Sequence, residues 1–436
     1  MHLFHRNTLL KPLIALLFLI STSSISLAET NCDSTLFPVI FVHGFMGAGD
    51  NWSLQARRFV SQGYCKENIY MFDWNSMGGR QKTDSILEVY LRKVLLETKA
   101  KKLVLVSHSA GGGLCYRFLK DSARAAMVSH YIHIGSSMLE KNAGPEANIP
   151  TLVIGSRDDK VVSISGGSKT SRQLILDGKD HMEVASCRET FDSIFTFLYN
   201  RKPARTIWRE ADDSIHLSGK ALLFGNNSPL NVQSIHVYRY DGIEGTRLDR
   251  TPWKYLKTDE NGRFSPFRCK QQQWLEFELP TTSGRKISYY YKSGTSSDHQ
   301  VYLRGFPEKG LAAMFLKGLP YDSGRSVMAI FSSDRAMIAG RDSLLADNKL
   351  LTNELNAPAS KTLMAVFLFD NGDGQSSYEY RADAGAGVFL SSIDMAIIPG
   401  KGKMTSFSYH GERLVLPNKP SDQSVQVAIF GGRESE

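Results

Sequence analysis

The sequence has 436 residues, which is more than one hydrophobic core usually serves, so we expect two or three domains. Hydrophobic residues make up 42% and charged residues 22% of the chain, which is typical of folded proteins and excludes disorder over most of its length. The formal net charge is +8, but the basic residues form no run, so nucleic acid is not an expected partner.

The N-terminus has the pattern of a secretory signal peptide. A weakly basic start precedes the apolar run PLIALLFLI at residues 12–20, and the small residues Ser26 and Ala28 lie at the −3 and −1 positions of a cleavage site. The apolar run is shorter than the roughly 20 residues that span a bilayer. The sequence therefore predicts a signal peptide over residues 1–28 and export to the periplasm or the extracellular space.

Export permits disulfide bonds, and the chain has five cysteines. Cys32 and Cys65 both lie early in the first domain, each beside an expected element, and we predict that they pair. The odd number leaves at least one free thiol. The cysteine spacings fit no zinc pattern, and the sequence predicts neither a metal site nor a cofactor.

Residues 29–202 have the sequence pattern of an α/β domain. Short apolar runs bounded by Gly, Asp or Pro alternate with helical patterns, which predicts a mostly parallel sheet with helices on both faces. The expected strands are residues 37–43, 68–74, 102–107, 130–135, 151–155 and 173–178, and the expected helices are residues 85–97, 114–121 and 191–199.

The remainder of the chain is β-rich. Alternating runs such as WLEFEL, together with recurrent turn residues, predict one or two β-sandwich or barrel domains, which we assign to residues 206–304 and 305–436. The tyrosines of ISYYYK at residues 287–292 have two interpretations: a surface for a lipid or insoluble substrate, or buried structure. The sequence leaves both open.

The stretch KKLVLVSHSAGGG at residues 101–113 predicts a nucleophile. A strand ends there, small residues allow a tight turn, and a helix follows, which is the strand–turn–helix arrangement of a nucleophile elbow. Ser109 lies at the centre of the turn. Its hydroxyl would project from the sheet at the N-terminus of the helix, where backbone N–H groups favour a developing anion.

A serine nucleophile needs a base and an orienting carboxylate, and in this arrangement they follow in the order Ser, Asp, His. The carboxylate candidates are Asp158 and Asp159, in TLVIGSRDDKVVS. We prefer Asp159, because hydrolases of this type usually have Asp-x-x-Val followed by Pro or a small residue. Asp159 with Val162 and Ser163 fits this pattern, and Asp158 fits it less well. His181 is the only histidine of this domain that follows them.

Two backbone amides complete the candidate site. The strand at residues 37–43 ends in a His-Gly pair, and in this fold the loop that follows supplies one oxyanion N–H, which we assign to Phe45. The residue after the nucleophile, Ala110, supplies the other.

Residues 33–200 resemble the α/β-hydrolase superfamily, and more narrowly small secreted bacterial lipases and esterases, through PVIFVHGFMG, VLVSHSAGGG and the closing segment HMEVASCRETFDSIFTFL. Residues 215–300, with HLSGKALLFGNNSPL and DENGRFSPF, resemble the β-domain that follows the catalytic domain in some archaeal and bacterial lipases. One position departs from the family pattern: Ser107 stands where a glycine usually precedes the nucleophile by two residues.

The resemblance implies hydrolysis of carboxylic esters through an acyl-enzyme, without a metal or organic cofactor. The substrate would be an ester or a lipid, free or at a lipid or polymer surface. A polyester or cutin-like depolymerase, and a catalytically inactive surface-binding protein acting through its β-domains, remain as alternatives. The sequence does not indicate an oligomeric state.

The segment at residues 136–150 is short, so we expect an open site without a helical lid. Phe45, Met46 and Met182 are candidates for the lining of an acyl pocket, although packing in a core explains them equally well.

Overall fold

The structure is a computed structural model. It describes residues 32–78, 80–164, 170–204, 209–210, 212–382, 387 and 389–431. The predicted signal peptide lies outside the described residues.

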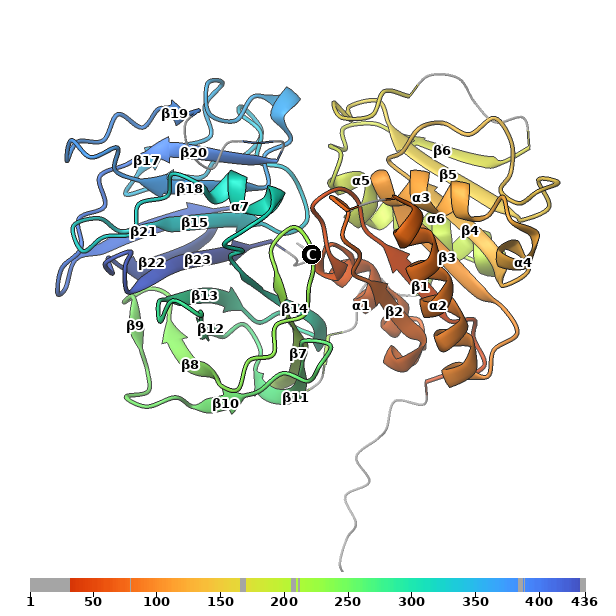
Figure 1. Cartoon of the computed structure of the whole chain (residues 1–436), viewed down its shortest axis with the longest axis horizontal. Coiled ribbons are helices and arrows are strands. Elements are labelled where there is room, and N and C mark those ends of the chain that lie inside the picture. Colours follow the sequence, from red (N-terminus) through yellow and green to blue (C-terminus); the bar gives the residue numbers. More distant parts are fainter. Residues whose placement is uncertain are drawn as a thin grey trace, which may run out of the picture. The chain divides into compact units, whose positions relative to one another are not determined.

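The first half of the described chain is built around a six-stranded parallel sheet with the order β2-β1-β3-β4-β5-β6 (Figure 1). Its strands are β1 Val39–Val42, β2 Ile69–Phe72, β3 Leu103–His108, β4 Val128–Ile134, β5 Thr151–Ser156 and β6 Arg172–Leu176. The helices are α1 Ser53–Ser61, α2 Arg80–Thr98, α3 Ala110–Phe118, α4 Ser122–Ala125, α5 Glu183–Ser186 and α6 Arg188–Tyr199, with 3-10 turns η1 Gly49–Trp52 and η2 Lys66–Asn68. All six predicted strands are present, so the predicted fold class is confirmed.

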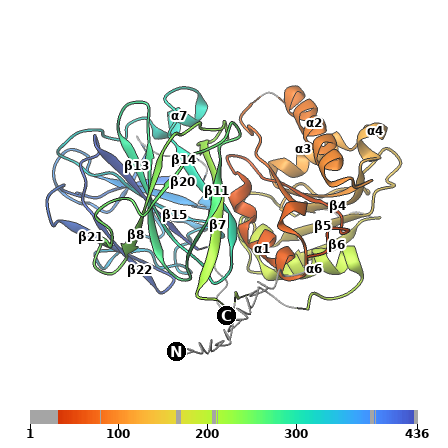
Figure 2. The same cartoon turned by 90° about the horizontal axis from the view of Figure 1, so that it is seen from below.

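Helices cover both faces of this sheet because successive residues of each buried strand point to opposite sides. Ile40 of β1 packs with Leu91 of α2 and Phe118 of α3. The next residue, Phe41, packs on the other face with Phe191 of α6, and α1 and α5 contribute to the same cluster. Figure 2 shows α2 and α3 on one side of β4, β5 and β6, and α1 and α6 on the other.

The predicted pairing of Cys32 with Cys65 is confirmed by a disulfide bond. The other three cysteines, Cys115, Cys187 and Cys269, are free and buried. In the described part of the chain, no helix has the length and apolar character needed to cross a membrane.

The second half is β-rich, as predicted, and forms three sheets (Figure 1). Its strands are β7 Ser214–Leu223, β8 Ile235–Asp241, β9 Thr246–Arg247, β10 Lys254–Leu256, β11 Arg263–Lys270, β12 Trp274–Pro280, β13 Lys286–Lys292, β14 Asp298–Gly305, β15 Met328–Ser332, β16 Leu345–Ala346, β17 Lys349–Leu350, β18 Ala365–Phe369, β19 Tyr380–Arg381, β20 Leu390–Asp394, β21 Met404–Tyr409, β22 Glu412–Pro417 and β23 Ser424–Phe430. One short helix, α7 Leu311–Leu316, and a 3-10 turn, η3 Ala359–Lys361, accompany them.

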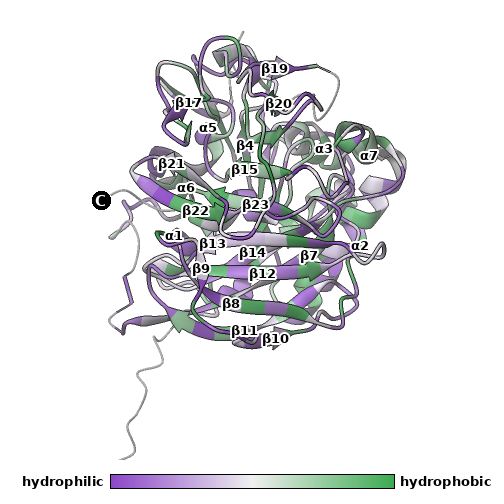
Figure 3. Ribbon diagram, turned by 90° about the vertical axis from the view of Figure 1, so that its left-hand side faces the viewer, coloured by the Kyte–Doolittle hydropathy of each residue, from purple (hydrophilic) through white to green (hydrophobic). Residues whose placement is uncertain are grey.

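A ten-stranded sheet forms the middle layer of this half. Its main path is β10-β8-β12-β13-β23-β15-β18-β20-β19, with β9 beside β8. One face shares a buried cluster with the three-stranded sheet β11-β7-β14, and the other face shares a second cluster with the four-stranded sheet β17-β16-β21-β22. In Figure 3 the strands of this half carry both hydrophilic and hydrophobic segments, as expected for sheets packed face to face.

The last strand links the two segments that the sequence analysis separates at residue 305. β23 lies between β13 and β15 and is parallel to both. Strands from both sides of the predicted boundary therefore share one sheet, and the division into two β-domains stays a prediction.

The tyrosines of β13 are part of this packing. Tyr289 and Tyr290 are buried, and Tyr291 is half-buried. Because two of the three are inaccessible to a surface substrate, the structure favours the structural interpretation of this segment.

Candidate active site

Ser109 lies on a strained turn between β3 and α3. Its backbone has φ 54° and ψ −124°, a region that non-glycine residues rarely occupy. The turn is held by hydrogen bonds from the Ser109 amide to the carbonyl of Ile134, at 3.0 Å, and from the Gly112 amide to the Ser109 carbonyl, at 2.8 Å. Because the turn follows the carboxyl end of β3, Ser109 lies at the carboxyl edge of the parallel sheet, where α/β proteins bind ligands.

The glycine after Ala110 is required by close packing. A Cβ atom at Gly111 would lie 2.5 Å from the carbonyl oxygen of His43 and 2.8 Å from that of Val42. Both atoms belong to the backbone at the end of β1, so neither can move easily. At Gly113, two residues further along the same helix, an added Cβ meets nothing within 4 Å.

This difference predicts opposite outcomes for two alanine substitutions. Gly111→Ala is expected to destabilise the protein by about 1–3 kcal/mol, because overpacking forces the backbone to shift. The same shift should displace Ser109, the predicted nucleophile, and lower the activity that depends on it. Gly113→Ala should leave the activity unchanged. It should leave the stability unchanged too, or raise it by up to about 1 kcal/mol through helix propensity. Chemical denaturation of the two variants checks this, and equal losses of stability would contradict the packing argument.

The structure brings Ser109, His181 and Asp159 together, although 72 and 22 residues separate His181 from the other two. The His181 Nε2 atom lies 2.9 Å from Ser109 Oγ, and its Nδ1 atom lies 2.8 Å from Asp159 Oδ2. Ser109 follows β3, Asp159 follows β5, and His181 lies between β6 and α5. The three residues therefore meet at one edge of the sheet.

The Asp159 carboxylate is held in its charged form. Burial alone would raise its pKa, but the hydrogen bond from His181, together with the backbone amides of Val161 and Val162 on Oδ1 at 2.8 and 2.9 Å, lowers the pKa below its usual value. The neighbouring Asp158 is exposed and accepts a hydrogen bond from the amide of Gly178 at 2.6 Å. The structure thus places Asp159, and not Asp158, against the imidazole.

The two predicted oxyanion donors belong to segments that adjoin Ser109. Ala110 is the first residue of α3, so its N–H is among the amides that have no partner within the helix. Phe45 belongs to the loop after β1, and the adjacent Gly44 abuts the turn so closely that an added Cβ would lie 2.8 Å from Ser109 Cβ. This geometry suits the roles predicted for Phe45 and Ala110.

Two histidines excluded as catalytic bases by chain order prove to support the site. His43 Nδ1 donates to the Gly44 carbonyl at 2.7 Å, while its Nε2 accepts from the Trp74 amide at 3.1 Å. His108 Nε2 donates to the backbone carbonyl of His181 at 2.8 Å. Burial lowers the pKa of His43 to about 4, and burial followed by the proximity of His181 lowers that of His108 to about 3. Both rings are therefore neutral at pH 7.

Asn227, from the β-rich half, also supports the loop after β1. Its Nδ2 atom lies 2.8 Å from the Gly47 carbonyl and 3.1 Å from His43 Nε2. Apart from the turn-forming pair of asparagines in FGNNSPL, no sequence pattern marks this role. His43 and His108 could have been noted from their positions beside Gly44 and Ser109.

Ser107, the departure from the family pattern, fits beneath the turn. Its side chain is fully buried, and its hydroxyl donates to Tyr131 Oη at 3.0 Å or to the Ile132 carbonyl at 3.2 Å. A buried hydroxyl with these partners carries no unsatisfied donor, so serine is accommodated at a position where glycine is usual.

A cavity of about 110 Å³ lies beside the candidate site. Phe45, Met46 and Met182 line it, as one of the two interpretations of these residues predicted. Met46 also belongs to the core that the β-rich half forms, so both interpretations hold for it. The β-rich half supplies much of the remaining lining, including Phe331 and Phe389.

The openness of the site stays a prediction, and the β-rich half borders the site on one side. No helix occurs between residues 136 and 150, as predicted, but the ring of Phe389 lies parallel to that of His181 within 3°, at a centroid distance of 6.1 Å. His181 is only 1% exposed. The β-rich half thus borders the site, which no local pattern of the catalytic segment could predict.

Two segments of the chain match known protein families. Residues 37–141, which carry the loop after β1 and the turn at Ser109, match the family of class 2 lipases. Residues 213–306 match the lipase C-terminal domain. The two matches support an α/β-hydrolase of the lipase and esterase type with a C-terminal domain.

Solved structures similar to this hydrolase include a carboxylesterase of Nitrososphaera gargenis, with 13% sequence identity, 38% of this chain and 91% of that chain covered, and a TM-score of 0.29. The Bacillus licheniformis lipase BlEst2 has 16% identity, 38% and 94% coverage, and a TM-score of 0.30. Aspergillus fumigatus lipase B has 14% identity, 40% and 56% coverage, and a TM-score of 0.30.

Among the residues with described positions, no group of three or more His, Cys, Asp or Glu side chains is arranged to hold a metal ion.

Proposed function

We propose that this chain is an exported serine hydrolase that cleaves carboxylic esters through an acyl-enzyme. The observation that carries the proposal is the hydrogen-bonded chain from Ser109 Oγ through His181 to Asp159, built on a strained turn. The match to the class 2 lipases supports ester hydrolysis. The hydrogen bonds that link Ser109, His181 and Asp159 support the serine mechanism.

In the first half of the reaction, His181 Nε2 accepts the proton of Ser109 as Oγ attacks the ester carbonyl. The resulting imidazolium donates through Nδ1 to the Asp159 carboxylate, whose lowered pKa keeps it charged for this purpose. His181 then passes its proton to the leaving alcohol. In the second half, a water molecule replaces the alcohol, and the same steps release the acid and restore Ser109.

The oxyanion of each tetrahedral intermediate would lie between the amides of Phe45 and Ala110. One such donor is typically worth about 3–4 kcal/mol of transition-state stabilisation. His43 and Asn227 hold the loop that carries Phe45, so that its amide requires little reorganisation during the reaction.

Export is supported by two features of the chain. The first residues have the signal-peptide pattern, and the Cys32–Cys65 disulfide is the kind of bond that persists in oxidising compartments. We assign the protein to the periplasm or the extracellular space.

The size of the cavity indicates a short acyl group. A cavity of about 150 Å³ in another protein accommodates benzene, which has six carbon atoms, and the cavity here measures about 110 Å³. Met46, Met182 and Phe389 make one part of its lining apolar, while Asp50 and Arg304 line another part. We therefore infer an acyl chain of about four carbons as the best fit.

A series of p-nitrophenyl esters tests this proposal. The ratio kcat/KM is expected to rise by about fourfold for each methylene that the cavity buries, from two to four acyl carbons, and then to stop rising. Phe389→Ala, which enlarges the cavity, should move the optimum to longer chains. A steady rise up to twelve carbons would contradict the cavity assignment, and the absence of turnover with every ester would contradict the proposed function.

The two alternative functions give other outcomes in the same assay. A polyester depolymerase would release soluble products from a polymer film, which a site bordered by Phe389 and Met182 does not favour. An inactive binding protein would show no turnover, and the intact contacts of His181 argue against it.

A further inference from the structure

The loop that carries His181 is attached to the β-rich half of the chain through Asp180. The Asp180 carboxylate is buried, and its two oxygens have different partners. Oδ1 accepts hydrogen bonds from the amides of Met182 and Glu183, at 2.9 and 3.0 Å. Oδ2 accepts from the amide of Ala336 at 3.1 Å and from Arg341 Nη2 at 2.9 Å. One carboxylate adjacent to the catalytic histidine thus joins α5 to a segment more than 150 residues away.

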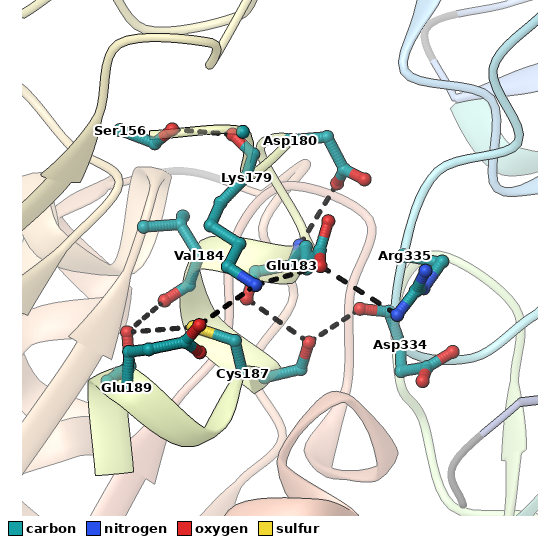
Figure 4. A network of polar contacts seen from close by, with 12 residues as sticks. Ser156, Lys179, Asp180, Glu183, Val184, Cys187, Glu189, Asp334 and Arg335 are labelled. Carbon is teal, nitrogen blue, oxygen red and sulfur yellow. Dashed lines mark hydrogen bonds and ion pairs between the residues drawn. The ribbon is translucent and has the colours of Figure 1, made fainter. Parts of the chain in front are cut away.

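The same distant segment, residues 334–342, makes further contacts with α5. Arg341 Nη1 lies 3.3 Å from Glu183 Oε2, and Arg335 lies 3.7 Å from Glu183 Oε1. The hydroxyl of Ser186, the last residue of α5, donates to the Asp334 carbonyl at 2.6 Å. Figure 4 shows Glu183 between the side chains of Lys179 and Arg335, with Asp334 next to Arg335.

Arg341 is the residue on which these contacts converge. Besides Asp180 and Glu183, it binds its neighbour Asp342, with Nε 2.9 Å from Oδ2. The side chains of the three carboxylates are 5%, 11% and 0% exposed. Removing one partner of a buried ion pair leaves an uncompensated charge, and the structure must then open to admit water. Because Asp180 directly precedes His181, such an opening at Asp180 would displace the backbone beside the imidazole.

The geometry points to Arg341 as a positioning residue for His181. This inference rests on the proposed function, since it concerns the same reaction. Arg341 does not contact the reacting atoms: it holds Asp180 and α5, and these hold the imidazole at 2.9 Å from Ser109 Oγ. A displacement of about 1 Å between reacting groups can cost about 100-fold in rate.

The chain offers a matched control. Arg325 lies in the same β-rich half, and its side chain is 32% exposed, against 31% for Arg341. It binds Asp322 through two nitrogens, at 2.6 and 2.8 Å, and its Nη1 atom lies 3.3 Å from the Asp370 carbonyl, so these side-chain contacts stay within the β-rich half. Arg325→Gln therefore removes an ion pair of an equally exposed arginine, with a partner, Asp322, that is 40% exposed, without touching the candidate site.

The experiment compares Arg341→Gln, Arg341→Lys and Arg325→Gln in the full mature protein, with kcat, KM and thermal unfolding measured on each. For Arg341→Gln we expect kcat to fall by about 10- to 100-fold with KM changed less than about threefold. Arg341→Lys should recover part of kcat, because it restores the charge. Arg325→Gln should keep the kcat of the parent protein, even if it lowers thermal stability as much as Arg341→Gln does.

Three outcomes would overturn the inference: a kcat within threefold of the parent in Arg341→Gln, an equal loss of kcat in both glutamine variants, or no recovery in Arg341→Lys. Should Arg341→Gln fail to fold, Asp180→Asn decides, because it weakens the same ion pair while keeping an oxygen for the Met182 amide. It should show the same fall of kcat at constant KM, and an unchanged kcat would overturn the inference. The proposed function fails separately, if Ser109→Ala in the parent protein retains hydrolysis.

Discussion

Ser109→Ala is expected to lower kcat for a short-chain p-nitrophenyl ester by about 10⁶-fold, the loss seen where a serine nucleophile acting with a histidine is removed. The methyl side chain offers no oxygen for attack on the carbonyl and none for the 2.9 Å contact with His181 Nε2. The amides of Phe45 and Ala110 remain, so slow hydrolysis by water at the oxyanion site should persist above the uncatalysed rate.

The substitution should not disturb the fold, since alanine meets the same backbone strain at φ 54° as serine does. Thermal unfolding of the variant within a few degrees of the parent protein is the control. Residual hydrolysis above about one part in a thousand, in protein free of parent enzyme, would mean that another group performs the attack.

The second large effect is expected at Asp159. Asp159→Asn should lower kcat by about 10⁴-fold, because an amide at this position no longer stabilises the imidazolium and favours the wrong tautomer of His181. Asp158→Asn is the matched control, as it lies one residue away and contacts the Gly178 amide instead of the imidazole. Its kcat should stay within a few-fold of the parent value. A larger loss at Asp158 than at Asp159 would reverse the assignment.

Local sequence patterns predicted the α/β half well. Each of its six strands is a short apolar run bounded by turn residues, and Ser109 lies in a dense cluster of small residues that only a tight turn requires. Helix α1, Ser53–Ser61, was not predicted, because polar and charged residues interrupt its apolar spacing.

Contacts between distant segments could not be predicted in this way. The alternation within β23 indicates a strand but does not specify that it pairs with β13, 138 residues earlier (Lys286 with Ser424), since strand order depends on packing of the whole sheet. For the same reason Arg341 and Asn227 carried no signal. Each is an ordinary polar residue in its own segment, and becomes part of the site only where the two halves of the chain meet.

The most direct test of the account is covalent labelling with a fluorophosphonate, which reacts with an activated serine hydroxyl. The mature protein is treated with one equivalent, and the adduct is located by mass spectrometry of its peptides. We expect one label per chain, on Ser109, with ester hydrolysis lost in proportion to labelling and no label on Ser109→Ala. An active protein that takes up the label at another residue, or that loses activity without an adduct on Ser109, would contradict the account.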